Sequence, residues 1–323
     1  MCSIGGAVFN HPISAIEAQK IVSLLLFFGR ERGDQSAGFW LDTLKEPVKR
    51  ALEVAEFLET VEYKSVWAKQ AQVQALLTHT RLPTSGGKDS KHAQPFQCGR
   101  TVTVHNGTIL NPEQLEKSFQ FYRKTNVDSE IFARYIARYG VRNLPKFLRA
   151  MSGCAAVGAY HNGSMYVFRD NNPLHICKIK GDGIIFGSTK KMVEFAVASL
   201  YGYYPADSDF VEIPENEVLR LMPDGTVEKV ATFVSMVTYQ SHWEREWGGY
   251  GYDPKFDADA PPFSTKGRII RTGSLVGPTP TVPVEPYSIW IKDTKRGRKN
   301  DDVIVIESPI GAVVESREGS GVE

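Results

Sequence analysis

Cysteine is scarce in this sequence, which has 323 residues but only four cysteines, at positions 2, 98, 154 and 177. Four thiols in so long a chain do not make a disulfide framework, and no two of them form a CxxC metal-binding pattern. The first residues carry no basic segment followed by a long apolar stretch, so we expect no secretory signal. These absences predict a reduced, cytoplasmic setting.

Long apolar runs and an excess of one charge are also missing. The strongest apolar run, residues 21–28, is far shorter than the ~20 residues that a membrane-spanning helix needs. The formal net charge is only +1, so no global field favours nucleic acid or an anionic membrane surface. We therefore expect neither a nucleic-acid nor a membrane partner. No GxGxxG motif is present, which argues against a dinucleotide-binding unit.

The elements that are present follow the order strands, helices, strands. Apolar residues at helical spacing predict helices at 15–32, 54–70, 112–121, 129–139, 143–151 and 190–202. Strands are predicted at 3–9, 36–41, 74–82 and 100–109, and hairpins at 154–170, 175–188 and 217–233, with Asn-Gly or Asp-Gly turns. This order indicates an α+β fold of two antiparallel sheets packed together, with helices on their outer faces.

The composition changes beyond about residue 240. "GPTPTVPVEP" favours polyproline II conformation, and "KDTKRGRKNDD" is a solvated charge run. Segments of this kind are usually linkers and tails. We therefore predict one globular domain over residues 2–239 and an irregular, partly disordered, Gly/Pro-rich tail over 240–323.

Cys2 and three separated stretches carry the chemistry. The stretches are "RGDQSAG" at 32–38, "THTRLPTSGG" at 78–87 and "HNGTI" at 105–109, and "VDSE" at 127–130 follows downstream. Each is weak alone, since an Asn-Gly pair is usually a turn and a cysteine at position 2 is usually chance. In this order they resemble the glutaminase domain of class II glutamine amidotransferases, a family that includes glutamine phosphoribosylpyrophosphate amidotransferase and glucosamine-6-phosphate synthase. "HAQPF" and "FRDNNPL" resemble family segments as well.

The resemblance implies a fold, a reaction and a set of site residues. The fold is the four-layer αββα sandwich of N-terminal-nucleophile hydrolases, and the reaction releases ammonia from L-glutamine through a thioester on Cys2. The implied catalytic residues are Cys2, Asn106 and Gly107, the substrate-binding residues Arg81, Thr84 and Asp128, and the supporting residues Arg32 and Gly33. Neither a metal nor a cofactor is implied.

An N-terminal cysteine can supply both the nucleophile and its base. Methionine before a small residue is ordinarily removed, which leaves the α-amino group of Cys2 free. That amine has a reference pKa of ~7.7–8.0, so it can accept the thiol proton without a histidine. We therefore expect His79 and His105 to be structural, and Cys98, Cys154 and Cys177 to be core thiols.

The residues after position 239 carry no P-loop, phosphoribosyl-binding or sugar-isomerase pattern. We therefore expect a glutaminase that supplies ammonia to a separate synthase partner, which modifies the acceptor. Two alternatives stay open. One is an N-terminal-nucleophile amidohydrolase of a different amide, and the other is a non-catalytic binding scaffold with the same fold.

Overall fold

The computed structural model describes residues 2–234, except 71, 83–88 and 180, together with two short strands near the C-terminus. The helices are α1 (Ala15–Gly29), α2 (Val54–Glu59), α3 (Val61–Trp67), α4 (Pro112–Phe119), α5 (Glu130–Tyr139), α6 (Leu144–Ala150) and α7 (Lys190–Tyr201), with 3-10 turns η1 (Arg30–Arg32), η2 (Ser90–His92), η3 (Val141–Asn143) and η4 (Asp207–Asp209).

The strands of the N-terminal unit are β1 (Ser3–Ser14), β2 (Ser36–Leu41), β3 (Val48–Arg50), β4 (Gln72–Arg81), β5 (Phe96–Cys98), β6 (Thr101–Ile109), β7 (Gly153–His161), β8 (Ser164–Arg169), β9 (His175–Ile179), β10 (Gly183–Gly187), β11 (Phe210–Glu212), β12 (Glu217–Leu221) and β13 (Val227–Thr232). A second unit, residues 253–323, contains the antiparallel pair β14 (Ser288–Ile289) and β15 (Ile306–Glu307).

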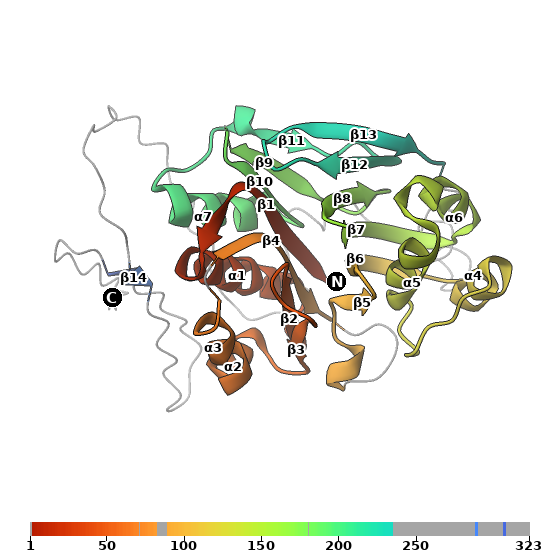
Figure 1. Ribbon diagram of the computed structural model, residues 1–323, viewed down its shortest axis with the longest axis horizontal. Coiled ribbons are helices and arrows are strands. Elements are labelled where there is room, and N and C mark those ends of the chain that lie inside the picture. Colours follow the sequence, from red (N-terminus) through yellow and green to blue (C-terminus); the bar gives the residue numbers. More distant parts are fainter. Residues whose placement is uncertain are drawn as a thin grey trace, which may run out of the picture. The chain divides into compact units, whose positions relative to one another are not determined.

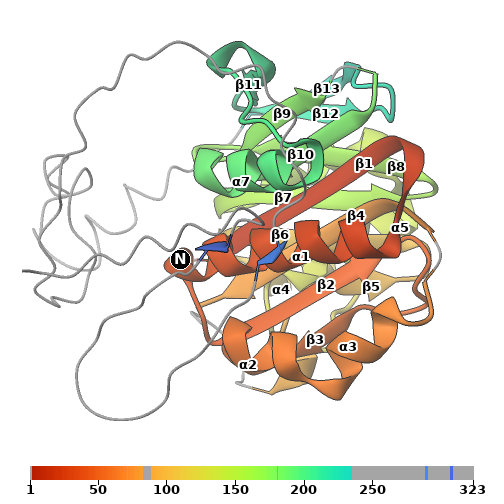
Figure 2. The same cartoon turned by 90° about the vertical axis from the view of Figure 1, so that its left-hand side faces the viewer.

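Two antiparallel sheets form the centre of the N-terminal unit. The first has the strand order β11-β9-β10-β1-β4-β2-β3, and the second has the order β13-β12-β8-β7-β6-β5. Figure 1 shows α1 and α7 on the outer side of the first sheet and α5 and α6 on the outer side of the second. Figure 2 shows α1 and α7 side by side in front of the first sheet. The predicted αββα arrangement is confirmed.

Local sequence signals explain much of this architecture. Ser14 caps α1 with a capping box, because its side chain accepts from Glu17 N–H and Glu17 accepts from its backbone. The Asn162-Gly163 turn has positive φ at both residues, 48° and 83°, as a two-residue hairpin requires. The hairpins β7–β8, β9–β10 and β12–β13 are all confirmed.

The predicted helix 54–70 is wrong as a single element. Thr60 has an extended backbone, and its side chain accepts a hydrogen bond from Tyr63 N–H, so it starts α3 as an N-cap and ends α2. The helical spacing of apolar residues continues across Thr60, so the periodicity of the sequence does not reveal the break. The three-residue strands β3, β5 and β11 were not predicted either, because segments this short have no measurable period.

The space between the sheets is filled mainly by aliphatic side chains, together with the aromatic side chains of Trp40 and Phe186. Phe186 of β10 lies against Gly6 of β1 and Gly158 of β7. A Cβ atom at Gly6 would stand 2.5 Å from the Phe186 ring, and one at Gly158 would stand 3.0 Å from it. Because neither glycine has a Cβ atom, the Phe186 ring fits between the sheets and the two layers pack closely.

We propose that the domain ends near residue 239, as the composition suggests. Phe233 is buried against the second sheet, where its ring lies 6.3 Å from that of Phe168, and its backbone N–H donates to Asn216 O. The expected boundary at 239 itself lies outside the described residues. The proposed domain therefore keeps every strand of both sheets.

A chain cut after residue 239 is expected to stay folded, with a melting temperature within a few degrees of the full chain. A chain cut after residue 226 loses β13 and Phe233, and removal of one buried aromatic alone typically costs ~3–5 kcal/mol. Circular dichroism melting of both truncations checks this. Equal destabilisation by the two cuts would show that the tail belongs to the fold.

Candidate active site

Cys2 directly precedes β1, which lies in the middle of the first sheet. β1 pairs with β4, with Ser3 opposite Thr80, so the register brings Cys2 beside Arg81 at the end of β4. The half-buried Cys2 thiol lies 3.7 Å from Leu82 O, to which it donates. Figure 1 shows the start of β1 beside β6 of the second sheet.

Strand alternation directs three predicted site residues into the space between the sheets. Ile4 and Val8 of β1 and Val104 of β6 belong to the core cluster between the sheets. Side chains two residues apart on a strand share a face, so Cys2 points the same way as Ile4, and Asn106 the same way as Val104. Arg81 shares its face of β4 with Leu77, which belongs to the same cluster. The fold therefore directs these three side chains into the same space.

The backbone N–H of Gly107 in β6 points away from the neighbouring strand β7. Gly107 stands opposite Ala155 of β7, and Ala155 uses its own N–H and C=O to bond Asp170 on its other side, at 2.8 and 2.9 Å. In an antiparallel ladder this makes Gly107 a non-hydrogen-bonded position, so its N–H points away from β7. A Cβ atom at residue 107 would stand 2.0 Å from Cys154 O, which only glycine avoids.

Asn106, the residue before Gly107, carries a second donor. Its side chain is 3% exposed, and its Nδ2 has no hydrogen-bond partner among the residues that the structure describes. Its backbone carbonyl accepts from Asn172 Nδ2 at 3.0 Å. The buried amide can therefore donate to a ligand oxygen.

Arg81 and Asp128 are buried charges near the thiol. They are 4% and 6% exposed. Burial is the main cause that raises the pKa of the Cys2 thiol; Arg81 opposes this shift and Asp128 adds to it. One Asp128 oxygen, Oδ2, accepts from Ile109 N–H at 2.7 Å. Both charges therefore lie within electrostatic reach of Cys2.

Arg32 contacts the strand that carries Cys2. Its Nε donates to Cys2 O at 3.1 Å, and burial lowers the pKa of its guanidinium. Gly33 follows η1, and its N–H donates to Arg30 O at 2.9 Å. Thr84, the remaining predicted site residue, lies outside the described residues.

Both histidines near the site are committed to backbone carbonyls. His79 Nε2 lies 3.2 Å from His105 O, and His105 Nε2 lies 3.3 Å from Cys154 O. A carbonyl only accepts, so each of these ring nitrogens carries a proton. Burial lowers the pKa of His79 to about 3 and also lowers the pKa of His105. Both rings are therefore neutral and hydrogen-bonded, as structural histidines are.

Two residues next to this site received no role from the sequence. Gln94, in "HAQPF", pairs its side-chain amide with the backbone of His105. Asn172, in "FRDNNPL", holds the carbonyl of Asn106. Both segments stood out as resembling the family, but the resemblance gives no contact between residues so far apart in sequence.

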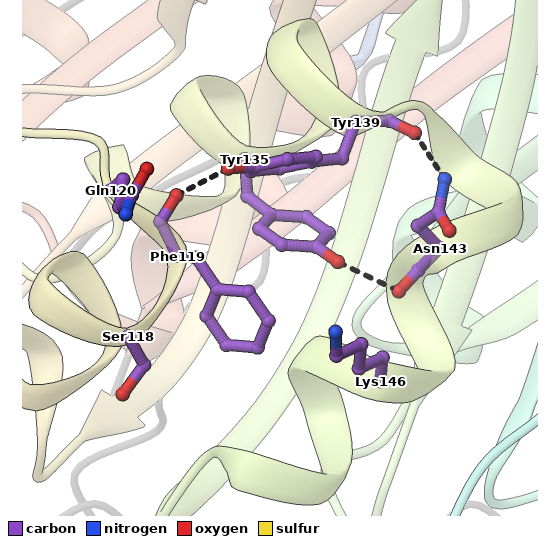
Figure 3. A pocket seen from close by; sticks show the side chains of 7 residues that line it. All are labelled: Ser118, Phe119, Gln120, Tyr135, Tyr139, Asn143 and Lys146. Carbon is purple, nitrogen blue, oxygen red and sulfur yellow. Dashed lines mark hydrogen bonds between the residues drawn. The ribbon is translucent and has the colours of Figure 1, made fainter.

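A separate cavity of about 290 Å³ lies among α4, α5 and α6. Its lining residues are Ser118, Phe119, Gln120, Tyr135, Tyr139, Asn143 and Lys146. Figure 3 shows that the hydroxyls of Tyr135 and Tyr139 are bonded to the carbonyls of Asn143 and Phe119. The cavity contains none of the predicted site residues, and the hydroxyls of its two tyrosines already donate to these backbone carbonyls.

Among the described residues, no group of three His, Cys, Asp or Glu side chains could hold a metal ion. Within the same part of the chain, no helix is long and apolar enough to cross a membrane.

Both a family model and individual proteins of known name match this chain. Residues 79–194 match a family model described as a glutamine amidotransferase domain. Amidophosphoribosyltransferase from Pasteurella multocida is 29% identical over 57% of this chain and 40% of its own length. 7-Cyano-7-deazaguanine synthase 2 from Sulfurisphaera tokodaii is 24% identical over 73% of this chain and 54% of its own length. The chain thus spans about half the length of these relatives, or less.

Among solved structures, the glutamine phosphoribosylpyrophosphate amidotransferase of B. subtilis is similar, with a TM-score of 0.53 and 19% identity. The match covers 72% of this chain and 49% of that one. At this identity the likeness concerns the fold.

Proposed function

Because the N-terminal domain of this chain belongs to the class II glutamine amidotransferases, we propose that it hydrolyses the side-chain amide of L-glutamine at Cys2. One observation carries the proposal: Asn106, whose buried Nδ2 has no hydrogen-bond partner among the described residues, directly precedes Gly107, whose N–H points away from β7. A buried donor without a partner typically costs ~1–3 kcal/mol, and a ligand oxygen bound here satisfies it. Two adjacent donors of this kind suit an oxyanion.

The Cys2 thiol needs a base, and its own α-amine is the best candidate. Burial raises the thiol pKa, so the group is protonated at neutral pH. The rings of His79 and His105 are poor bases, since burial lowers the pKa of both and each uses one nitrogen on a carbonyl. After removal of Met1, the α-amine of Cys2, with a reference pKa of ~7.7–8.0, can accept the thiol proton directly or through one water.

The proposed reaction has two halves. The Cys2 sulfur attacks the amide carbon of glutamine while its proton passes to the α-amine, and the oxyanion is held by Asn106 Nδ2 and Gly107 N–H. The C–N bond then breaks, and the amine returns the proton to the leaving nitrogen, which departs as ammonia. Water attacks the thioester in the same way and releases glutamate and the free thiol. A single oxyanion donor is typically worth ~10²–10³ in rate.

The two ends of the amino acid need opposite charges. We assign the α-carboxylate of glutamine to Arg81 and its α-ammonium to Asp128. The burial of Arg81 and Asp128 supports this assignment, because a buried guanidinium binds a carboxylate more strongly than an exposed guanidinium does. Thr84 is kept as a pocket residue, and Arg32 and Gly33 as residues that order the start of β1.

A second protein that uses the ammonia is part of the proposal. One relative is named a transferase and another a synthase, which supports an acceptor-modifying enzyme as the user of the ammonia. We therefore propose that an acceptor-modifying synthase is a separate partner of this chain.

Replacing the nucleophile tests the reaction directly. Cys2→Ala is expected to lower ammonia release from glutamine by at least ~10³-fold, as loss of a covalent nucleophile typically does. The unfolding temperature should change little, because Cys2 is half-buried and directly precedes a strand. Diazo-oxo-norleucine, an electrophilic glutamine analogue, should add to Cys2 of the wild type, and its adduct peptide should begin at Cys2.

Cys98→Ala is the matched control, since Cys98 is also half-buried and lies outside the proposed site. It should hydrolyse glutamine like the wild type. Diazo-oxo-norleucine bound to Cys98, Cys154 or Cys177, or a wild type that keeps Met1 and is still fully active, would contradict the mechanism.

The charged pair is tested by conservative changes, because both residues are buried. Asp128→Asn keeps an oxygen for Ile109 N–H but removes the charge, and Arg81→Lys keeps a cation but loses the planar fork. Loss of one partner of a desolvated charge pair typically costs ~2–5 kcal/mol, so KM for glutamine should rise by roughly 30-fold or more. Steady-state rates of ammonia release at varied glutamine concentration measure this KM.

Glutaramate, which is glutamine without its α-amino group, is the matched substrate for this experiment. In the wild type, KM for glutaramate should exceed KM for glutamine by about the same factor by which Asp128→Asn raises KM for glutamine. With glutaramate as substrate, Asp128→Asn should then raise KM little further. Unchanged KM values for glutamine in both variants would show that the pair does not bind the substrate, and would favour an amidohydrolase of another amide.

The partner is tested in the native cells. An acceptor-modifying enzyme should co-purify with this chain, and the purified complex should aminate its acceptor with glutamine as nitrogen source. The Cys2→Ala complex should do so only with added ammonia. Glutamine-dependent amination that persists in the Cys2→Ala complex would rule out this supply route.

A further inference from the structure

The edge of β6 next to the proposed oxyanion hole is completed by a side chain instead of a strand. β5 pairs only with Thr101, Val102 and Thr103 of β6. Beyond that point, His105 N–H donates to Gln94 Oε1 at 2.7 Å, and Gln94 Nε2 donates to His105 O at 2.9 Å. The Gln94 amide thus makes the two hydrogen bonds that a paired residue of a neighbouring strand would make.

Gln94 is itself held firmly by the first sheet. Lys49 of β3 donates from Nζ to the carbonyls on both sides of Gln94, Ala93 O at 2.7 Å and Pro95 O at 3.0 Å. Gly38 of β2 lets the backbone come close, since a Cβ atom there would stand 2.2 Å from Gln94 O. The side chain of Gln94 is buried, at 2% exposed. Its amide therefore has a fixed position relative to β2 and β3.

The residue that Gln94 holds is directly followed by the proposed oxyanion donors. Asn106 and Gly107 come next to His105 on the same strand, and Gly107 N–H faces the same edge as His105 N–H. A shift of His105 along or away from this edge moves both donors with it. Since a misplacement of about 1 Å can cost ~10² in rate, the hydrogen bonds of Gln94 bear directly on catalysis.

We propose that Gln94 is a positioning residue that sets the oxyanion hole of this enzyme, by holding the backbone of His105 from the first sheet. The inference rests on the proposed glutaminase function and deepens it. Gln94 acts through His105 and does not touch the substrate.

The experiment compares Gln94→Ala and Gln94→Met with Gln97→Ala in the full-length protein. Gln97 is the matched control, because it is a glutamine three residues on whose Nε2 donates to Lys45 O and Gly99 O, away from β6. Both Gln94 variants should lower kcat for glutamine by roughly 10- to 100-fold and change KM less than about threefold. Gln97→Ala should behave like the wild type. Gln94→Met keeps most of the side-chain volume and serves if Gln94→Ala does not fold.

Two further readouts separate positioning from a general structural role. The rate of Cys2 alkylation by iodoacetamide should be unchanged in the Gln94 variants, because this reaction needs no oxyanion hole. In an Asn106→Ala background, Gln94→Met should lower kcat by less than about threefold, since the hole that it sets is already incomplete.

The possible failures are distinguishable. Wild-type kcat in Gln94→Met, a full additive loss in the Asn106→Ala background, or slower alkylation of Cys2 overturns the role of Gln94 while the glutaminase function stands. A wild type and Gln97→Ala that both release no ammonia, and whose Cys2 is not labelled by diazo-oxo-norleucine, overturn the proposed function and this inference with it.

Discussion

The carbonyl oxygen of His105 is the point on which the geometry of the candidate site depends. It accepts from His79 Nε2 of the first sheet at 3.2 Å and from Gln94 Nε2 at 2.9 Å. The His105 ring is fixed in turn by Ser129 Oγ at 2.8 Å and Cys154 O at 3.3 Å. Buried polar groups that are satisfied from several elements allow little freedom, so β6 holds one position against β1 and β4.

This constraint explains how a site can be built from strands of both sheets. The side chains of Cys2 and Arg81 come from adjacent central strands of one sheet, and Asn106 comes from a strand of the other. All three point into the space between the sheets, where the core cluster ends. A rigid two-sheet scaffold thus holds a candidate nucleophile and a candidate oxyanion donor.

The electrostatics make neither neighbouring histidine a good base for the Cys2 thiol. Burial raises the pKa of the Cys2 thiol and lowers the pKa of both neighbouring histidines, so none of these groups is charged at neutral pH. The nearby charges are instead those of Arg81, Asp128 and Arg32. An arrangement of this kind suits a zwitterionic ligand better than an imidazole-based proton relay.

The sequence by itself determined the features that depend on neighbouring residues. The Asn162-Gly163 turn predicted its hairpin, and the order of strands and hairpins predicted two sheets covered by helices. The ordered motifs around Cys2, Arg81 and Asn106 indicated the family. Only the tertiary structure decided the rest. The break at Thr60 lies inside an unbroken apolar period, and β5 is too short to have one. The pairing of Gln94 with His105 joins residues on different elements, and nothing in the local sequence of either residue encodes a hydrogen bond to the other.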